Sequence, residues 1–383
     1  MKKLLRITTV PISLKILLKE QLYFMSKHFE VVGVSSGLKE LEEVKEEEGI
    51  RVVALDMSRE ITPLGDLLSL LKMIFLLLKE KPDILHTHTP KAGIVGMLAG
   101  WICRVPHRLH TVAGLPVMEA RGKKKTLLLA VEKLTYFCAS RVYPNSYGLK
   151  EYIVENSLVR EEKLKVIGHG SSNGINTLFF QRSEVVMDDA KKIVKEYALQ
   201  DRFVFCFVGR VVRDKGINEL LDAFDRLSLE SDAIRLLILG DFESSLDPIS
   251  SDAQRVLEEN KQVLHVGFVD DIRGYLAASD VFVLPSYREG FPNVVLQAAS
   301  MELPSIVSDI NGCNEIITHN ENGLIVPPKS NKALLDAMKS FLDERELAKK
   351  LSLNSRNDII KKYDRENFHN YLLQEYKEVL KNG

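Results

Sequence analysis

The feature that most constrains the fold is a regular alternation of short apolar segments with helical patterns, which runs through the chain twice. Segments that are apolar almost throughout are typical of strands buried on both faces of a parallel sheet. The predicted strands span residues 2–10, 29–36, 50–57, 82–88, 107–112, 141–146 and 164–170 in the first half, and 202–209, 234–241, 263–268, 280–286, 304–309 and 323–328 in the second. The pattern predicts an α/β chain with two Rossmann-like domains, each built on a parallel sheet.

The boundary between the two domains is predicted in "GSSNGINTLFF" (170–180), which is rich in Gly, Ser and Asn. A chain of 383 residues is also long enough for two cores. We predict an N-terminal domain over residues 1–172, a C-terminal domain over 173–364, and a last helix over 365–383, for which packing back on the N-terminal domain is one option among several. Ligands of such sheets bind outside the carboxyl ends of the strands, so the loops there are the candidate site.

Two segments near the start resemble targeting or membrane segments only superficially. "MKKLLRITTVPISL" lacks a small-residue cleavage site and is interrupted by Arg6 and Pro11, so we predict a first strand. "LLSLLKMIFLLLKE" (67–80) contains Lys72 and is shorter than the ~20 apolar residues that span a bilayer, so we predict a helix packed on the sheet. The four cysteines form no CxxC pair, which indicates a reducing, cytoplasmic location.

Charge is distributed unevenly between the two halves. The net charge of the whole chain is −1, but residues 1–170 carry +7 and the remainder carries −8. The segment from His86 to Lys150 holds ten Lys and Arg against two acids and includes "RGKKK" (121–125). This bias indicates an anionic partner for the first half, such as a phospholipid surface, a lipid diphosphate or nucleic acid, although a solvated basic face is an alternative for the run itself.

The loop after strand 202–209 reads "GRVVRDKG" and leads into a helix near Ile217. Gly209 lets the backbone approach a ligand, the helix start offers free N–H groups, and Arg210 and Lys215 supply the cations that suit a diphosphate. The loop is neither a Walker A motif nor a GxGxxG motif. An ordinary strand-to-helix turn with surface charges is the alternative.

The loop after strand 280–286 reads "SYREGFPNVVLQAAS" (286–300). Proline suits a first helical turn, so we predict a helix that begins close to Pro292. Glu289 then lies just outside the helix start and Gln297 lies more than one turn inside it. The alternatives are a carboxylate favourably placed near a helix N-terminus and an ordinary polar helix residue.

These two loops, followed by "NGCNEIITHNENGLIVPP", resemble the nucleotide-sugar domain of the retaining glycosyltransferases with the GT-B fold, of glycosyltransferase family 4, group 1 type. In the first half, "HTHTPKAGIVGMLAG", "HRLHTVAGLP" and "YPNS" resemble members that extend capsule, O-antigen or N-glycan precursors on an undecaprenyl diphosphate carrier. The resemblance implies two Rossmann-like domains that face each other across a cleft, with the acceptor on the first and the nucleotide sugar on the second.

The resemblance also implies roles for particular residues. The family has a glutamate, seven residues and a second glutamate; the first matches Glu289, and the second falls on Gln297, which can still bond ribose hydroxyls. The family's histidine matches His110. The implied catalytic residues are His110, Arg210, Lys215 and Glu289, and the implied donor site comprises Gly209, Arg210, Lys215, Asp241, Val269, Glu289, Gly290, Phe291, Pro292, Asn293 and Gln297. The family's glycine pair after the first strand is absent, and without the resemblance His110 reads as a core histidine.

No cofactor and no metal are expected. His86 and His88 alternate along a strand, but no Asp, Glu or Cys lies nearby to complete a metal site. The sequence also lacks a DxD-like carboxylate pair, which fits a metal-independent transferase that stabilises the leaving diphosphate with Arg210 and Lys215.

The resemblance implies transfer of a hexose or N-acetylhexosamine from a nucleotide diphosphate sugar, preferably a UDP-sugar, to a polyprenyl-diphosphate-linked glycan with retention of configuration. It places the enzyme in bacterial surface polysaccharide or glycan biosynthesis, in the cytoplasm, with peripheral contact at the anionic inner face of the membrane. Two alternatives remain open: a sugar-nucleotide 2-epimerase on the same scaffold, or a non-catalytic nucleotide-sugar-binding assembly subunit. A nucleic-acid partner is not expected, because it explains neither loop of the second half.

Overall fold

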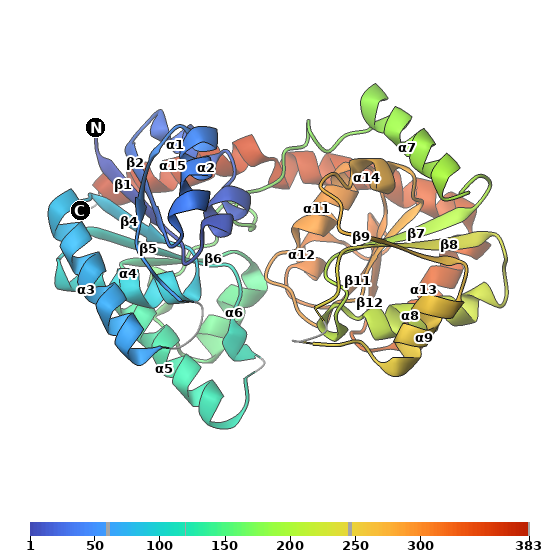
Figure 1. Ribbon diagram of the computed structural model, residues 1–383, viewed down its shortest axis with the longest axis horizontal. Helices are drawn as coiled ribbons and strands as arrows, with labels where there is room; N and C mark the ends of the chain where they lie inside the picture. Colours follow the sequence, from blue (N-terminus) through green and yellow to red (C-terminus); the bar gives the residue numbers. More distant parts are fainter. Residues whose placement is uncertain (59–61, 119, 244–246, 382–383) are drawn as a thin grey trace. The chain divides into compact units, whose positions relative to one another are not determined.

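The computed structural model describes residues 1–58, 62–118, 120–243 and 247–381. The chain forms two compact units (Figure 1). The first unit comprises Met1–Gly174 together with the C-terminal segment that begins at Arg365, and the second comprises Ile175–Asp364. Each unit has its own sheet and its own hydrophobic core.

The first unit is built on a six-stranded sheet with the order β3-β2-β1-β4-β5-β6, in which every neighbouring pair is parallel. Its strands are β1 (Lys3–Ile7), β2 (Glu30–Ser35), β3 (Arg51–Ala54), β4 (Ile84–Thr87), β5 (His107–Val112) and β6 (Arg141–Pro144). Its helices are α1 (Gln21–Ser26), α2 (Leu38–Glu48), α3 (Pro63–Glu80), α4 (Pro90–Ile102), α5 (Gly122–Cys138), α6 (Tyr147–Glu155) and α15 (Arg365–Lys381), with short turns of helix at Ser13–Leu17, Pro116–Met118 and Glu161–Lys163. Helices α3 to α6 share one core, and α1, α2 and α15 share the other.

The second unit repeats this design with the order β12-β11-β10-β7-β8-β9, again parallel throughout. Its strands are β7 (Phe203–Val208), β8 (Ile234–Leu239), β9 (Val263–Gly267), β10 (Val281–Leu284), β11 (Ser305–Ser308) and β12 (Gly323–Val326). Its helices are α7 (Glu184–Glu196), α8 (Ile217–Ser228), α9 (Ser251–Glu259), α10 (Arg273–Ala277), α11 (Asn293–Ser300), α12 (Cys313–Ile316), α13 (Asn331–Asp343) and α14 (Arg345–Tyr363), with a short 3₁₀ turn at Arg213–Lys215.

Numbered from its own first strand, each sheet has the Rossmann order 3-2-1-4-5-6. The predicted fold class, two Rossmann-like domains with parallel sheets, is confirmed. One predicted strand is wrong: residues 164–170 contribute only an isolated bridge between Leu164 and Val142. The chain cannot continue as a strand there, because Gly168 (φ +56°) and Gly170 (φ +103°) turn it out of the extended conformation.

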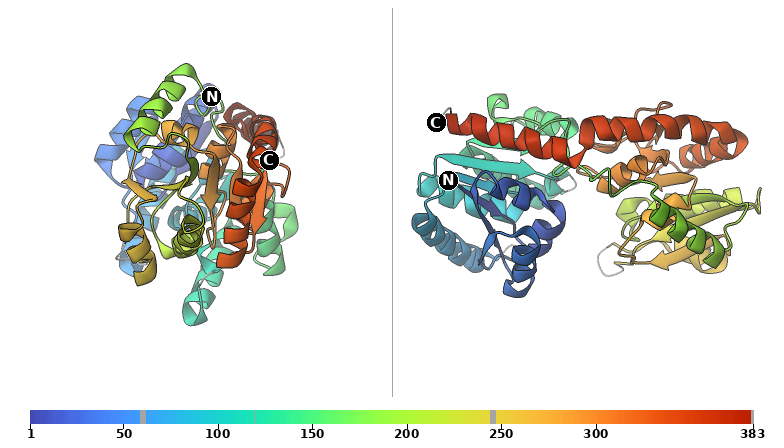
Figure 2. Two further views of the ribbon diagram at one scale, coloured as in Figure 1. Left: turned by 90° about the vertical axis from the view of Figure 1, so that its right-hand side faces the viewer. Right: turned by 90° about the horizontal axis from the view of Figure 1, so that it is seen from above.

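The C-terminal helix α15 is part of the first unit's core. Phe368, Leu372 and Tyr376 are buried with Leu4 of β1 and Phe29, which precedes β2. In Figure 2 this red helix lies along the strands and helices of the first unit, which are blue to cyan. A segment nearly two hundred residues away in sequence therefore completes the first core.

The first segments of the chain adopt the predicted elements. Residues 3–7 form β1, an interior strand of the sheet, and the apolar stretch 67–80 lies within α3. Among the residues that the structure describes, no helix is both long and apolar enough to cross a bilayer.

Candidate functional site

A pocket of about 470 Å³ lies in the second unit at the carboxyl ends of β7, β8 and β9. This is the edge where parallel sheets of this topology bind ligands. The pocket is lined by Phe179, Phe180, Val208, Gly209, Arg210, Leu239, Gly240, Asp241, Glu243, Phe268, Val269, Asp270, Asp271, Ile272 and Gln297. Apolar walls with a few polar and charged groups are typical of a small-molecule site.

Two glycines allow the loops at this edge to approach one another closely. A Cβ on Gly216 would lie 2.1 Å from the carbonyl oxygen of Pro285, and a Cβ on Gly240 would lie 2.0 Å from that of Gly209. Both glycines also have positive φ, at +71° and +135°. The loop after β7 therefore contacts the loops after β8 and β10 only because no side chain separates them.

An ion pair between Lys215 and Glu289 joins the loop after β7 to the loop after β10. Lys215 Nζ lies 2.5 Å from Glu289 Oε1, and the Ser286 hydroxyl donates to the same oxygen at 2.9 Å. Only 19% of the lysine side chain and 13% of the glutamate side chain are exposed. Because both charges are largely withdrawn from water, each depends on the other for its stability.

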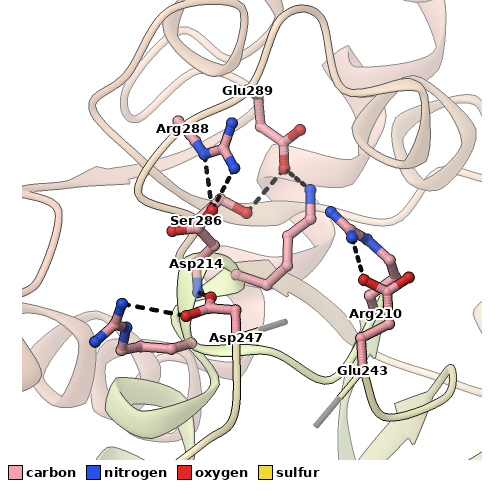
Figure 3. Close-up of polar contacts among 9 residues, drawn as sticks. Arg210, Asp214, Glu243, Asp247, Ser286, Arg288 and Glu289 are labelled. Atoms are coloured by element: carbon pink, nitrogen blue, oxygen red, sulfur yellow. Dashed lines mark hydrogen bonds and ion pairs between the residues drawn. The ribbon is translucent and has the colours of Figure 1, made fainter. Parts of the chain in front are cut away.

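A second cation, Arg210, lies at the rim of the pocket. Its Nη1 donates to Glu243 Oε2 at 2.5 Å, and 54% of the Arg210 side chain is exposed (Figure 3). An ion pair this exposed contributes little stability. Arg210 can therefore exchange Glu243 for an anionic ligand at low cost.

Further hydrogen bonds hold the two loops in place. Asp247 accepts the Asp214 backbone N–H at 2.7 Å, and Arg288 Nε donates to the Asp214 carboxylate at 2.7 Å (Figure 3). The Asn311 side-chain amide donates to the carbonyl oxygens of Glu289 and Gly290, at 3.1 and 2.7 Å. The backbone around Glu289 is thus fixed from both sides.

The predicted donor residues fall into two adjacent groups. Five line the pocket itself: Gly209, Arg210, Asp241, Val269 and Gln297. The other group lies in the loops beside it and comprises Lys215, Glu289, Gly290, Phe291, Pro292 and Asn293. Helix α11 begins at Asn293 with Pro292 as its N-cap, as predicted.

Two of these residues have side chains with structural contacts. The Phe291 ring is buried and packs against Tyr363 at 5.4 Å between centroids, so this residue offers the site its backbone. The Asp241 carboxylate accepts the backbone N–H of Phe268 at 3.2 Å and so joins the loops after β8 and β9.

His110 belongs to the first unit and is not part of this pocket. It lies on β5 beneath α4, where a Cβ on Gly93 would come within 2.6 Å of its ring. Its Nδ1 is 2.7 Å from the Thr87 hydroxyl. Burial lowers the pKa of His110 to about 4, so the ring is neutral at physiological pH. Its implied role at the donor sugar stays a prediction.

Sequence reasoning missed several residues of the site. Ser286 stands three residues before Glu289, and this spacing could have identified it as a hydrogen-bond donor to the carboxylate. Phe179 and Phe180 line the pocket from the segment that contains the predicted domain boundary, and Glu243 follows β8 without a recognisable motif. No local pattern marks these three positions.

The two histidines considered as metal ligands, His86 and His88, lie in the interior of the first unit. His86 and His88 are buried on and after β4, with ring centroids 4.1 Å apart. Within the described ranges, no three His, Cys, Asp or Glu residues are grouped closely enough to hold a metal ion.

Comparison with known proteins gives two matching families along the chain. Residues 27–170 match the family described as "Glycosyl transferase 4-like domain", and residues 189–358 match "Glycosyl transferases group 1". These matches favour sugar transfer over the epimerase alternative.

Individual relatives agree. The chain is 34% identical, over 94% of its length and 93% of the relative's, to the capsular polysaccharide biosynthesis glycosyltransferase CapM of Staphylococcus aureus. It is 32% identical, over 79% of its length and 77% of the relative's, to the Escherichia coli UDP-Gal:alpha-D-GlcNAc-diphosphoundecaprenol alpha-1,3-galactosyltransferase. Among solved structures, Anabaena HepE in complex with UDP superposes with a TM-score of 0.81 at 19% identity, covering 99% of this chain and all of HepE. That last similarity establishes the fold.

Proposed function

The chain belongs to the group 1 glycosyltransferases, and from this premise we propose that it moves a hexose or N-acetylhexosamine from a UDP-sugar to a polyprenyl-diphosphate-linked glycan, with retention of configuration. The observation that carries the proposal is the largely buried Lys215–Glu289 pair beside a pocket at the carboxyl edge of the second sheet. The pair brings a cation and a hydroxyl-binding carboxylate together where the diphosphate and the sugar of a donor would meet.

In the proposed reaction the bond between the anomeric carbon and the diphosphate oxygen breaks, and a bond to an acceptor hydroxyl forms. Negative charge then builds on the departing diphosphate. Lys215 and Arg210 stabilise that charge together with the backbone N–H groups at the starts of α8 and α11. Glu289, held by Ser286 and Lys215, binds the sugar hydroxyls, and Gln297 binds the ribose through its amide. As the acceptor hydroxyl attacks, its proton passes to an oxygen of the departing diphosphate, which leaves as the nucleoside diphosphate.

The choice of UDP and of a lipid-linked acceptor is supported by the relatives. The E. coli relative is named for UDP-Gal and for an acceptor on diphosphoundecaprenol, and HepE was solved with UDP. We propose an acceptor of this class on the first unit, metal-independent transfer, and a cytoplasmic enzyme of surface polysaccharide biosynthesis that contacts the membrane peripherally. The basic segment from His86 to Lys150 supports the membrane contact.

A transfer assay tests the proposal. The full chain is incubated with labelled UDP-glucose, UDP-galactose, UDP-N-acetylglucosamine or UDP-N-acetylgalactosamine and with short polyprenyl diphosphate monosaccharides, with and without EDTA. We expect one donor to give a disaccharide lipid with the donor's anomeric configuration, and EDTA to have no effect. Conversion of the UDP-sugar without acceptor would establish the epimerase instead. Donor binding without any turnover across the acceptor panel would establish the non-catalytic binder.

A further inference from the structure

Helix α3 carries a stripe of exposed apolar side chains along its solvent-facing side. Its exposed apolar side chains are Leu64, Leu67, Leu68, Leu71, Phe75 and Leu78. These positions recur at helical spacing and form one stripe, opposite the Met73 and Leu77 side chains that pack into the core. Phe75 is 80% exposed. Helix α3 is therefore apolar on two faces, and its exposed face has no partner in the described part of the chain.

The neighbouring helices continue this surface. α3 packs beside α4, and α4 packs beside α5, on the same side of the first sheet (Figure 1). On α5 the exposed apolar side chains are Leu127, Leu134 and Phe137, and at the end of α4 they are Trp101 and Ile102. We call the exposed apolar side chains of these three helices the α3–α5 face.

Two contacts show that the parts of this face are continuous. The Trp101 and Phe137 rings lie 6.4 Å apart between centroids, which joins the end of α4 to the end of α5. Cys103, directly after α4, has its sulfur 3.8 Å from the carbonyl oxygen of Ile74, which precedes Phe75 on α3. Isolated exposed leucines are ordinary, but a contiguous apolar surface of this extent marks an interaction site.

The charges around the α3–α5 face are predominantly positive. The exposed cations on or directly beside the three helices are Lys72, Lys79, Lys81, Arg104, Arg121, Lys123, Lys124 and Lys133. The three helices contain only three carboxylates. Glu80 and Glu132 are buried, and Asp66 is paired with Lys91 at 2.6 Å. Of the exposed cations, Lys72 pairs with the exposed Asp56 at 3.0 Å. The others outnumber the carboxylates of the three helices, so the rim of the apolar face has a net positive charge.

We propose that the α3–α5 face is the surface by which this protein docks on an anionic phospholipid bilayer. Apolar side chains enter the boundary between headgroups and acyl chains, a tryptophan lies at that level, and the surrounding lysines and arginines contact anionic headgroups. The charge argues against a second copy of this chain as the occupant, because a two-fold contact would place one basic rim against another. This inference deepens the proposed membrane contact and names its residues, but it does not depend on which sugar is transferred.

Co-sedimentation of the full chain with vesicles tests the docking surface without donor or acceptor. The wild type is expected to bind vesicles of phosphatidylglycerol and phosphatidylcholine, and to bind phosphatidylcholine alone at least about tenfold more weakly. The variant Leu71→Ser/Phe75→Ser should bind the anionic vesicles at least about tenfold more weakly than the wild type does. Lys123→Gln/Lys124→Gln should weaken binding by about tenfold at low salt and less at high salt.

Matched controls come from the second unit. Leu229 and Leu353 are 85% and 74% exposed, so Leu229→Ser/Leu353→Ser removes as many exposed apolar side chains away from the face. Lys191→Gln/Lys192→Gln likewise removes two exposed lysines. Both controls should bind vesicles like the wild type.

Three results would overturn the inference. The first is that the wild type binds neutral and anionic vesicles equally well, and the second is that Leu71→Ser/Phe75→Ser binds anionic vesicles like the wild type. The third is that neither protein binds vesicles, while sedimentation velocity shows a wild-type dimer that Leu71→Ser/Phe75→Ser converts to a monomer. Because vesicle binding is measured without substrates, failure here leaves the glycosyl transfer assay with a soluble short-chain acceptor as an independent test of the proposed function.

Discussion

The two units share one strand order, but they keep their polar side chains in different places. In the first unit, titratable groups lie inside, among them Arg6, His86, His88, His110 and His369, all buried. In the second unit the charged groups gather at the carboxyl edge of the sheet, around Lys215, Glu289 and Arg210. The same topology thus uses polar groups for internal cohesion in one unit and for the proposed ligand site in the other.

The interior network of the first unit explains why α15 belongs to it. Arg6 on β1 donates from Nε to His88 Nε2 at 2.9 Å and from Nη1 to the Tyr376 hydroxyl at 3.0 Å. The same hydroxyl lies 2.6 Å from His86 Nδ1. Because His88 accepts through Nε2, its proton is on Nδ1, and burial keeps the pKa of both histidines well below the ordinary value. Arg6, Tyr376 and two neutral imidazoles thus link β1 and the end of β4 to α15.

The largest expected effect is at the charged edge of the second unit. Lys215→Ala should lower kcat/KM for glycosyl transfer by about 10³-fold, roughly 4 kcal/mol, because a fixed cation at the leaving diphosphate is lost. Lys215→Arg keeps the charge and should lose less. Lys349→Ala, an exposed lysine of α14, is the matched control. If Lys215→Ala and Lys349→Ala have equal activity, the charged edge is not a catalytic site and the contrast between the units fails.

The next effect is an acid sensitivity confined to the first unit. Burial lowers the pKa of His110 to about 4 and that of His369 to about 3. A histidine with a lowered folded-state pKa stabilises the fold fully above its unfolded pKa of about 6.5, and this stability declines as pH falls below that value. Between about pH 6.5 and 5.5 each of the two should contribute a loss of about 1 kcal/mol.

Trp101, the one tryptophan of the chain, reports on the first unit, so urea unfolding followed by its fluorescence measures this loss. His369→Gln, at a residue 2.8 Å from Asn173 Oδ1, should reduce the pH dependence. His265→Gln, at an exposed histidine of the second unit, should leave it unchanged. Equal pH dependence in all three proteins would show that buried imidazoles do not set the acid limit.

The smallest expected effect is at the rim of the pocket. Glu243 competes with a ligand anion for Arg210, so Glu243→Gln should tighten nucleoside diphosphate binding a few-fold, by less than about 1 kcal/mol. Fluorescence competition with a labelled nucleotide measures the change. Glu258→Gln, at a carboxylate of α9 that does not line the pocket, is the control. Weaker binding in Glu243→Gln would mean that this carboxylate contacts the ligand itself.

The parts of this fold that were predictable from sequence are those with local causes. Thirteen strands are predicted from apolar runs, and twelve of them are present in the structure. The pattern of glycine, proline and charged residues predicts the loops that hold Arg210, Lys215 and Glu289. The one strand prediction that is wrong, residues 164–170, contains Gly168 and Gly170, and glycines at such positions are also a signal for a turn.

The remaining features depend on contacts between distant segments. The burial of Arg6 depends on Tyr376, 370 residues away, and no pattern around "LLRITTV" indicates it. Phe179 and Phe180 become pocket residues only when the chain that enters the second unit passes beside the loops after β7 to β9. The leucines of α3 predicted a helix on the sheet, but their periodicity does not separate the core face from the exposed face, because both are apolar.

The central claim is that the charged edge of the second unit binds a nucleoside diphosphate. Calorimetric titration of the full chain with UDP, GDP and ADP tests it most directly, repeated with Arg210→Ala and Gln297→Glu. The account predicts that UDP binds, that Arg210→Ala weakens binding by about tenfold through loss of a phosphate contact, and that Gln297→Glu binds as well as the wild type or more tightly. Absence of binding by all three nucleotides, or equal UDP affinity in Arg210→Ala and the wild type, would contradict it.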